Sequence, residues 1–178
     1  MNRLSLSALA LAGAVALAGC TSAPAMNDPA DLAAVAAVRN GFGTGFAAGD
    51  ADAIAKLYTS DAISMGNHQP SATGVAAITA ANKAFFAAMS AKLEITPDET
   101  MTMGNQGFDR GHFKMTLTPK AGGPAIIDEG RYVVLLAKGA DGAWKVTRDI
   151  DNSSLPMPMP MPMPMPMPTM APAKGKGK

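Results

Sequence analysis

The chain has 178 residues, of which 48% are hydrophobic, with 15 basic and 14 acidic side chains, a formal net charge of +1 and one cysteine. This composition is sufficient for one ordinary domain, and it excludes a disulfide-rich scaffold and a wholly disordered chain. The near-zero net charge excludes nucleic-acid binding through overall basicity.

Charge and unusual residues are unevenly distributed along the chain. Residues 28–155 contain 11 basic and 14 acidic residues, whereas three lysines end the chain. Half of the methionines (7 of 14) and 8 of the 14 prolines follow Leu155. We therefore predict a signal peptide at residues 1–19, a tether at 20–27, a folded domain at 28–155 and a disordered low-complexity tail at 156–178.

The first twenty residues have the features of a secretory signal. Arg3 gives a positive start, and the apolar run over residues 4–18 is short for a permanent membrane span. Residues 17–20, Leu-Ala-Gly-Cys, resemble the lipobox of bacterial lipoproteins at all four positions. The resemblance implies cleavage before Cys20, diacylglycerol on its thiol and acylation of the new N-terminus. The alternative is a lone thiol in an ordinary signal peptide.

The residue after Cys20 bears on the destination of the protein. By the same resemblance, Thr21 in place of aspartate directs a lipoprotein to the outer membrane. We therefore expect a cell-envelope location, on the periplasmic face of the outer membrane. Several buried acyl chains, at about 0.8 kcal/mol per methylene, would make the anchor effectively permanent.

Apolar residues recur at steps of three and four over residues 28–48, which predicts a helix. Asn27 or Asp28 is its expected N-cap. Gly41, Gly43 and Gly45 each weaken this helix by up to about 1 kcal/mol relative to alanine, so we expect close packing there or fraying. The apolar stripe consists of Leu32, Val35, Val38, Phe42 and Phe46.

The rest of the domain changes from helical to strand periodicity. Asp50 is the expected cap of a second helix, which residues 58–61 close, followed by a short strand at 62–65, turns at 66–73 and a third helix at about 74–90. Alternation then predicts strands at 93–103, 108–118, 126–137 and 143–152, joined by short links as an antiparallel meander. The predicted fold class is α+β, with helices on one face of a curved antiparallel sheet.

Two motifs resemble the nuclear-transport-factor-2-like superfamily, in its SnoaL-like and ketosteroid-isomerase-like branch, and most closely the secreted group called domain of unknown function 4440. The first is residues 49–62, GDADAIAKLYTSDA, and the second combines Gly130-Arg131-Tyr132 with residues 141–146 and 148–152. The resemblance covers about residues 30–153. It implies a cone, in which a bent sheet wraps round the first and third helices and leaves a pocket at the open end.

Members of this superfamily differ in chemistry, so function has to be inferred from the pocket residues. Proton abstraction needs a carboxylate or histidine in an apolar cavity with a donor nearby. The weak catalytic candidates are His112, Asp149 and Tyr58. Alternation places His112 and Phe113 on different faces of the sheet. His112 is therefore expected on the solvent or dimer face unless a bulge reverses its direction. The strands offer Asp109, His112, Asp128, Glu129, Asp149 and Asp151, with Tyr58 and Tyr132 as phenolic donors.

Alternation also assigns the residues of the last strand to two faces of the sheet. It sends Asp149 away from the core, where an ion pair with Arg131 or Arg148 is the alternative to a role as a base. Asn152 has the core parity and, by resemblance, is expected at the pocket mouth. Trp144 is most economically a packing residue, and Tyr58 either caps the pocket or packs at the core edge. The pocket candidates are Tyr58, Tyr132, Trp144 and Asn152.

No cluster in the domain has metal-ligand spacing, and we expect no cofactor. Residues 156–168 alternate proline and methionine, which favours polyproline II geometry and a semi-rigid spacer. Thioethers also suit Cu(I), which makes the tail a weak copper candidate through Met157, Met159, Met161, Met163, Met165 and Met167.

We therefore expect a lipid-anchored cell-envelope protein whose pocket binds a small apolar molecule or a partner, rather than an enzyme. Its expected partners are the membrane, through Cys20, and a second copy in a homodimer, with no nucleic acid. One alternative is a cofactor-independent isomerase or lyase of ketosteroid-isomerase type. Another is a copper-handling lipoprotein that acts through the tail.

Lipidation is directly testable. Labelled palmitate supplied to expressing cells should appear on the wild-type chain and be absent from Cys20→Ala, because the lipid is expected to be attached through the Cys20 sulfur. The comparison is read by gel fluorography of the immunoprecipitated protein. Label that persists on Cys20→Ala would overturn the anchor.

Overall fold

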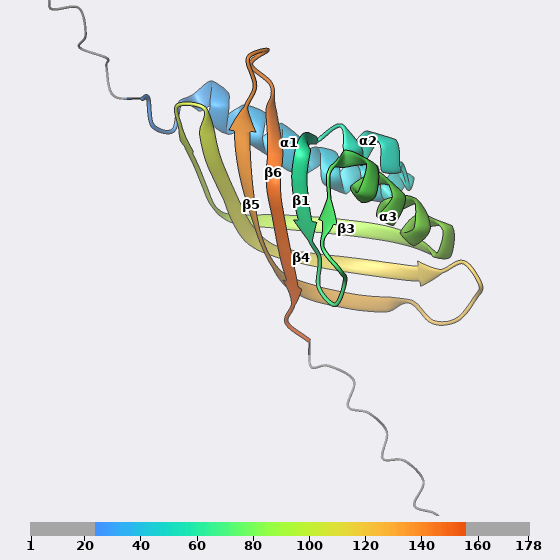
Figure 1. Cartoon of the computed structure of the whole chain (residues 1–178). Helices are drawn as coiled ribbons and strands as arrows, with labels where there is room; N and C mark the ends of the chain where they lie inside the picture. The colour runs from blue at the N-terminus through green and yellow to red at the C-terminus, as the bar shows by residue number, and fades with distance from the viewer. Residues whose placement is uncertain (1–23, 156–178) are drawn as a thin grey trace, which may run out of the picture.

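A computed structural model of the chain describes residues 24–155 (Figure 1). Three helices and two short strands come first and four long strands follow, which confirms the predicted α+β class. The helices are α1 (Pro29–Ala48), α2 (Ala51–Ala55) and α3 (Val75–Ala88). The strands are β1 (Tyr58–Met65), β2 (Ala72–Thr73), β3 (Met89–Met103), β4 (Gln106–Pro119), β5 (Ile126–Lys138) and β6 (Trp144–Ser153).

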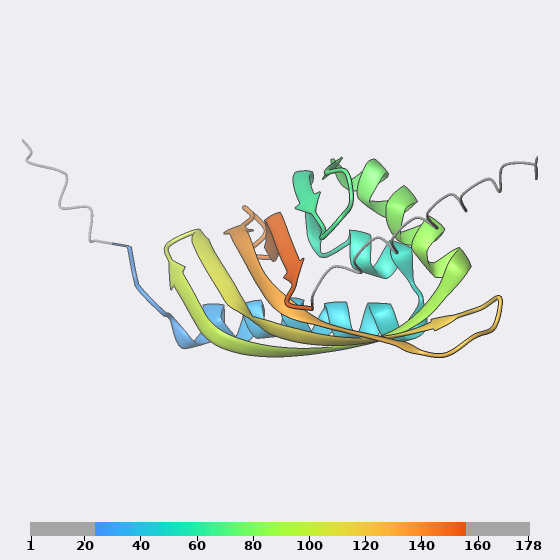
Figure 2. The ribbon, with the colours of Figure 1, turned by 90° about the horizontal axis from the view of Figure 1, so that it is seen from below.

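The strands form one sheet in the order β2-β1-β6-β5-β4-β3. Strands β3 to β6 pair antiparallel with their neighbours, as the meander prediction requires. β1 adds to the other side of β6 in parallel, and the two-residue β2 pairs with β1. The sheet is strongly bent, and Figure 2 shows the long strands curving past the helices. The result is an open, curved sheet with helices packed against it.

The ends of α1 and α2 follow from capping chemistry. Asp28 caps α1 by accepting a hydrogen bond from the backbone N–H of Ala30 at 2.8 Å. Gly49 adopts a left-handed conformation, with φ 64°, which ends the helix as glycine readily does. Asp50 caps α2 by accepting from the N–H of Ala53 at 2.8 Å. The predicted caps therefore define both helices.

The second helix ends earlier than its sequence pattern predicts. Residues 58–61 belong to β1, not to the closing turn of a helix. The reason is tertiary, because the Val146 N–H of β6 donates to the Leu57 carbonyl at 2.8 Å and the Tyr58 backbone pairs with Val146. Pairing with β6 thus extends the chain before the helical signal ends.

The glycines of α1 mark close packing. A Cβ on Gly45 would lie 2.5 Å from Cγ1 of Ile54, and one on Gly41 would lie 3.0 Å from Cδ2 of Leu57. Both contacts press α1 against α2 and the segment after it, where Ile54 is fully buried. Of the two expectations for this turn, close packing is the one that holds. The core around it contains Val35, Phe42, Ile54, Ile78, Phe86, Val134, Leu136, Trp144 and Val146.

One extra residue interrupts the pairing of β6 with β5. Val146 lies opposite Leu136, but Arg148 lies opposite Leu135, so Thr147 is unmatched. Such a bulge reverses the side-chain parity of the residues that follow it. Every inward position of β6 after Thr147 is therefore shifted by one.

None of the helices in the described part of the chain is both long and apolar enough to cross a membrane.

The packing of α1 predicts opposite effects at two glycines. Gly45→Ala should lower the free energy of unfolding by about 1–3 kcal/mol, because the new methyl group meets Ile54. Gly43→Ala is the matched control, since its Cβ would meet only the Leu93 carbonyl oxygen at 3.4 Å, and it should raise stability by about 0.5–1 kcal/mol. Urea unfolding of the two variants measures both changes. Equal effects of the two substitutions would contradict this packing.

Candidate ligand cavity

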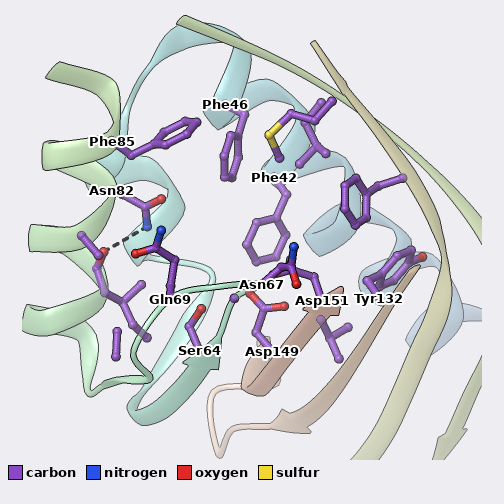
Figure 3. Close-up of a pocket in the computed structure, with 18 of the residues that line it drawn as sticks. Phe42, Phe46, Ser64, Asn67, Gln69, Asn82, Phe85, Tyr132, Asp149 and Asp151 are labelled. Carbon is purple, nitrogen blue, oxygen red and sulfur yellow. Dashed lines mark hydrogen bonds between the residues drawn. The ribbon is translucent and has the colours of Figure 1, made fainter. Parts of the chain in front are cut away.

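The concave side of the sheet and the helices enclose a cavity of about 710 Å³ (Figure 3). Its apolar lining comes from α1, α3 and the inner faces of β3 to β5, and the turn after β1 lies at its edge. A volume of this size is typical of a small-molecule site. The principal apolar side chains are Val35, Val38, Phe42, Phe46, Ile78, Phe85, Leu93, Ile95, Phe113, Met115, Leu117, Val134 and Leu136.

The carboxylates of β6 lie at one side of this cavity. Figure 3 shows Asp149 and Asp151 pointing inward from β6, with Ser64 nearby, while Phe46 and Phe85 occupy the opposite side. The sheet register explains the grouping, because Ser64 on β1 pairs with Asp149 on β6. The cavity therefore has an aromatic end and a carboxylate end.

The bulge at Thr147 is what brings Asp149 into the cavity. Strict alternation predicts that Asp149 points away from the core, and this prediction is wrong because the unmatched residue reverses the parity. Asp149 forms no ion pair with Arg131 or Arg148. Instead, it accepts a hydrogen bond from the Tyr58 hydroxyl at 2.5 Å.

Burial changes the acid–base properties of this pair. Loss of water raises the pKa of Asp149 to about 6, against the lowering effect of the Tyr58 hydrogen bond and with a further raising effect from Asp151. Burial also raises the pKa of Tyr58 well above its usual value, and the neighbouring Asp149 charge adds to that shift. At neutral pH the pair is consequently a carboxylate held by a neutral phenol.

Two further carboxylates line the same end. Asp151 accepts a hydrogen bond from the Asn67 backbone N–H at 3.2 Å, and burial raises its pKa. Asp128 accepts from the Ser153 hydroxyl at 2.6 Å. Asp128 lies on β5 and Asp151 on β6, so both adjacent strands contribute negative charge to the cavity.

A separate buried network lies deeper in the wall. Asp109 is 1% exposed and pairs with Arg39 at 2.6 Å. The same carboxylate accepts hydrogen bonds from the Tyr132 hydroxyl at 3.0 Å and the Thr100 hydroxyl at 2.5 Å. Burial and the Asp109 charge both raise the pKa of Tyr132. The network satisfies a charge that would otherwise be costly to bury.

Comparison with known families assigns the domain. A family model described as a SnoaL-like domain matches residues 38–147, which is more than half of the chain. The chain belongs to the SnoaL-like family. The search of curated proteins found no match.

Several solved structures share the fold of this SnoaL-like domain. A ketosteroid isomerase-like protein from Erwinia carotovora atroseptica is 26% identical, with a TM-score of 0.66 over 71% of this chain and 98% of that chain. A conserved protein from Planctomyces limnophilus is 19% identical, with the same TM-score and the same coverage. A nuclear transport factor 2-like superfamily protein from Salmonella enterica is 11% identical, with a TM-score of 0.66 over 76% of this chain and 99% of that chain.

The other candidate residues of the SnoaL-like domain lie in different places. His112 is on the outer face of β4, where its Nδ1 lies 3.2 Å from the Asp98 carboxylate and 56% of its side chain is exposed. Trp144 is buried in the core, and its indole N–H donates to Asp31 at 2.9 Å. Asn152 is exposed and does not line the cavity, because the same bulge turns it outward. Of the four pocket candidates, the cavity contains Tyr58 and Tyr132.

Sequence reasoning missed the ion-pair partner Arg39. A signal was present, because Arg39 follows the stripe residue Val35 by four positions and so lies at the edge of the apolar face of α1. Asp109 likewise shares the parity of Phe113 on β4, which indicates an inward side chain. An inward arginine and an inward aspartate together predict a buried pair.

The described residues were compared with the ligand groups that metal ions need. Within residues 24–155, no group of three or more His, Cys, Asp or Glu side chains is arranged to hold a metal ion. Cys20 and the six candidate copper ligands, Met157 to Met167, lie outside the described residues, so lipidation and copper binding stay predictions.

The raised pKa of Asp149 predicts a pH-dependent effect on stability. Folding favours the protonated form, since the pKa rises from 3.8 to about 6, so this group lowers stability as pH increases through that interval. Asp149→Asn should therefore gain stability relative to wild type between pH 4 and 7, by at most about 3 kcal/mol, and then reach a plateau. Denaturant unfolding at several pH values measures the difference. Asp52→Asn, at an exposed site, is the control and should show no such gain.

Proposed function

We propose that this SnoaL-like domain is a small-molecule-binding protein of the cell envelope, held at the membrane through lipid on Cys20. The observation that carries the binding proposal is the cavity of about 710 Å³, whose apolar lining surrounds one polar end. Ligand pockets in proteins combine a mostly apolar wall with a few oriented polar groups in this way. The lipobox-like residues 17–20 support the anchor, and Thr21 after Cys20 supports the outer-membrane location.

The hydrogen bonds favour binding over isomerase or lyase chemistry of ketosteroid-isomerase type. Asp149 has the location and pKa of a general base. Proton abstraction next to a carbonyl also needs a donor for the developing oxyanion. Tyr58 already donates to Asp149 and Tyr132 already donates to Asp109, so both phenols are engaged by carboxylates. The arrangement therefore orients a ligand better than it stabilises an enolate.

The outer face of the sheet supports a homodimer as part of this proposal. Val133 on β5 lies opposite Ile150 on β6, and these side chains are 38% and 43% exposed. Leu135 and Ile127 extend the apolar surface along β5, with 44% and 50% exposure. An apolar surface of this kind on a sheet is stabilised when a second copy covers it. Self-association through this face would leave the cavity on the opposite side free.

Obstructing the cavity should weaken the binding of a neutral apolar probe. Ala81 is an exposed residue of α3 that lines the cavity, so the ring of Ala81→Phe narrows its opening and should weaken Nile red binding at least tenfold. The measurement is fluorescence titration of the mature chain carrying Cys20→Ser, which prevents acylation.

Ala80→Phe is the matched control because Ala80 is exposed on the same helix as Ala81 is, but does not line the cavity. It should bind the probe as the parent chain does. Equal binding by Ala81→Phe and Ala80→Phe would show that the dye occupies another surface, and the proposal would fail.

A further inference from the structure

The carboxylate end of the cavity has no internal counter-charge. None of the ion pairs within residues 24–155 includes Asp128, Asp149 or Asp151. Their polar partners are the Ser153 and Tyr58 hydroxyls and the Asn67 backbone N–H, which are neutral donors. A cavity that holds several ionised carboxylates with neutral partners carries a negative potential.

The cation in the cavity wall is already neutralised. Arg39 lies 2.6 Å from the buried Asp109 and also donates to the Thr100 hydroxyl. Releasing Arg39 to an anionic ligand would leave Asp109 buried and unpaired, at a large cost in free energy. His68 lines the cavity from the turn after β1, where it is exposed to solvent. An anionic ligand thus meets no available permanent cation among the described lining residues.

The aromatic lining provides an independent indication of ligand charge. Phe42 and Tyr58 pack edge to face with ring centroids 5.5 Å apart, and Phe46 packs similarly against Phe85 at 6.0 Å. All four rings line the cavity, with Tyr58 hydrogen-bonded to Asp149 at the carboxylate end and Phe46 and Phe85 on the opposite side. Aromatic faces attract cations through their quadrupole, and anions are disfavoured there. Rings and carboxylates together form an environment suited to a positively charged nitrogen on an apolar body.

We infer that the cavity selects apolar amines, with the cationic nitrogen at Asp149 and Asp151 and the apolar body among the rings of α1 and α3. This inference rests on the proposed function, since it names the class of ligand for the same cavity. The cavity forms the site, and the carboxylates decide which charge it accepts. A protonated amine can donate hydrogen bonds to both carboxylates, whereas an alcohol of equal size offers one donor and no charge.

The inference includes a direction for pH. Tyr58, Asp151, Asp128 and the rim residue His68 are the titratable groups that line this end with Asp149, while Arg39 and Asp109 form their own pair. Amine affinity should rise between pH 5 and 7, because Asp149 ionises in that interval while an alkylamine stays protonated.

Three ligands that share a naphthalene ring test the inference: the cation of 2-(1-naphthyl)ethylamine, the neutral 2-(1-naphthyl)ethanol and the anion of 1-naphthylacetic acid, called the acetate below. Isothermal titration calorimetry on the mature chain with Cys20→Ser, at pH 7.5, should give amine binding at least tenfold tighter than the alcohol, with the acetate weakest. Asp149→Asn combined with Asp151→Asn should weaken amine binding about tenfold and leave the alcohol within about twofold. Retained alcohol binding shows that the double variant is folded.

Glu94→Gln combined with Glu129→Gln is the matched control, because it removes two exposed carboxylates on the outer face of the sheet. Amine affinity should be unchanged in it, which separates cavity charge from net charge. Acetate binding as tight as the amine, or amine affinity unaffected by the Asp149 and Asp151 substitutions, would overturn the amine inference alone. Failure of all three ligands, the alcohol included, would overturn the proposed function as well.

Discussion

The unmatched Thr147 in β6 determines the chemistry of the cavity. Before it, Trp144 and Val146 face the core, and after it, Asp149 and Asp151 take the inward positions. Without the extra residue, Ile150 and Asn152 would line the cavity, and the carboxylates would be on the outer face. The polar end, the raised pKa of Asp149 and the hydrogen bond from Tyr58 all depend on this local change of register.

The cavity wall contains two carboxylate sites with different electrostatics, one at Asp109 and one at Asp149. Asp109 is neutralised by Arg39 and fixed by hydroxyl donors, so it contributes a rigid wall. Asp149 has a neutral phenol as its partner and faces open cavity, so its charge remains available to a ligand. The protein thus pairs a buried carboxylate with a cation at one site and with a neutral donor at the other.

The parallel pairing of β1 with β6 connects the family motif to this site. The motif of residues 49–62 begins at the glycine that ends α1 and continues into β1, where it positions Tyr58. Because Ser64 pairs with Asp149, β1 lies beside the segment of β6 that carries the carboxylates. The close contact of Gly45 with Ile54 fixes α2 against α1 and so holds the start of β1 in place.

The sequence alone determined the class of fold, the capped ends of α1 and α2, the meander and the outward position of His112, because caps and periodicities are local signals. Tertiary structure alone decided the direction of Asp149 and Asn152, since a bulge at a threonine leaves no mark in the alternation. It also decided the early start of β1, through pairing with a strand about 90 residues later. Contacts between distant segments, which no local pattern encodes, thus gave the cavity its charged end.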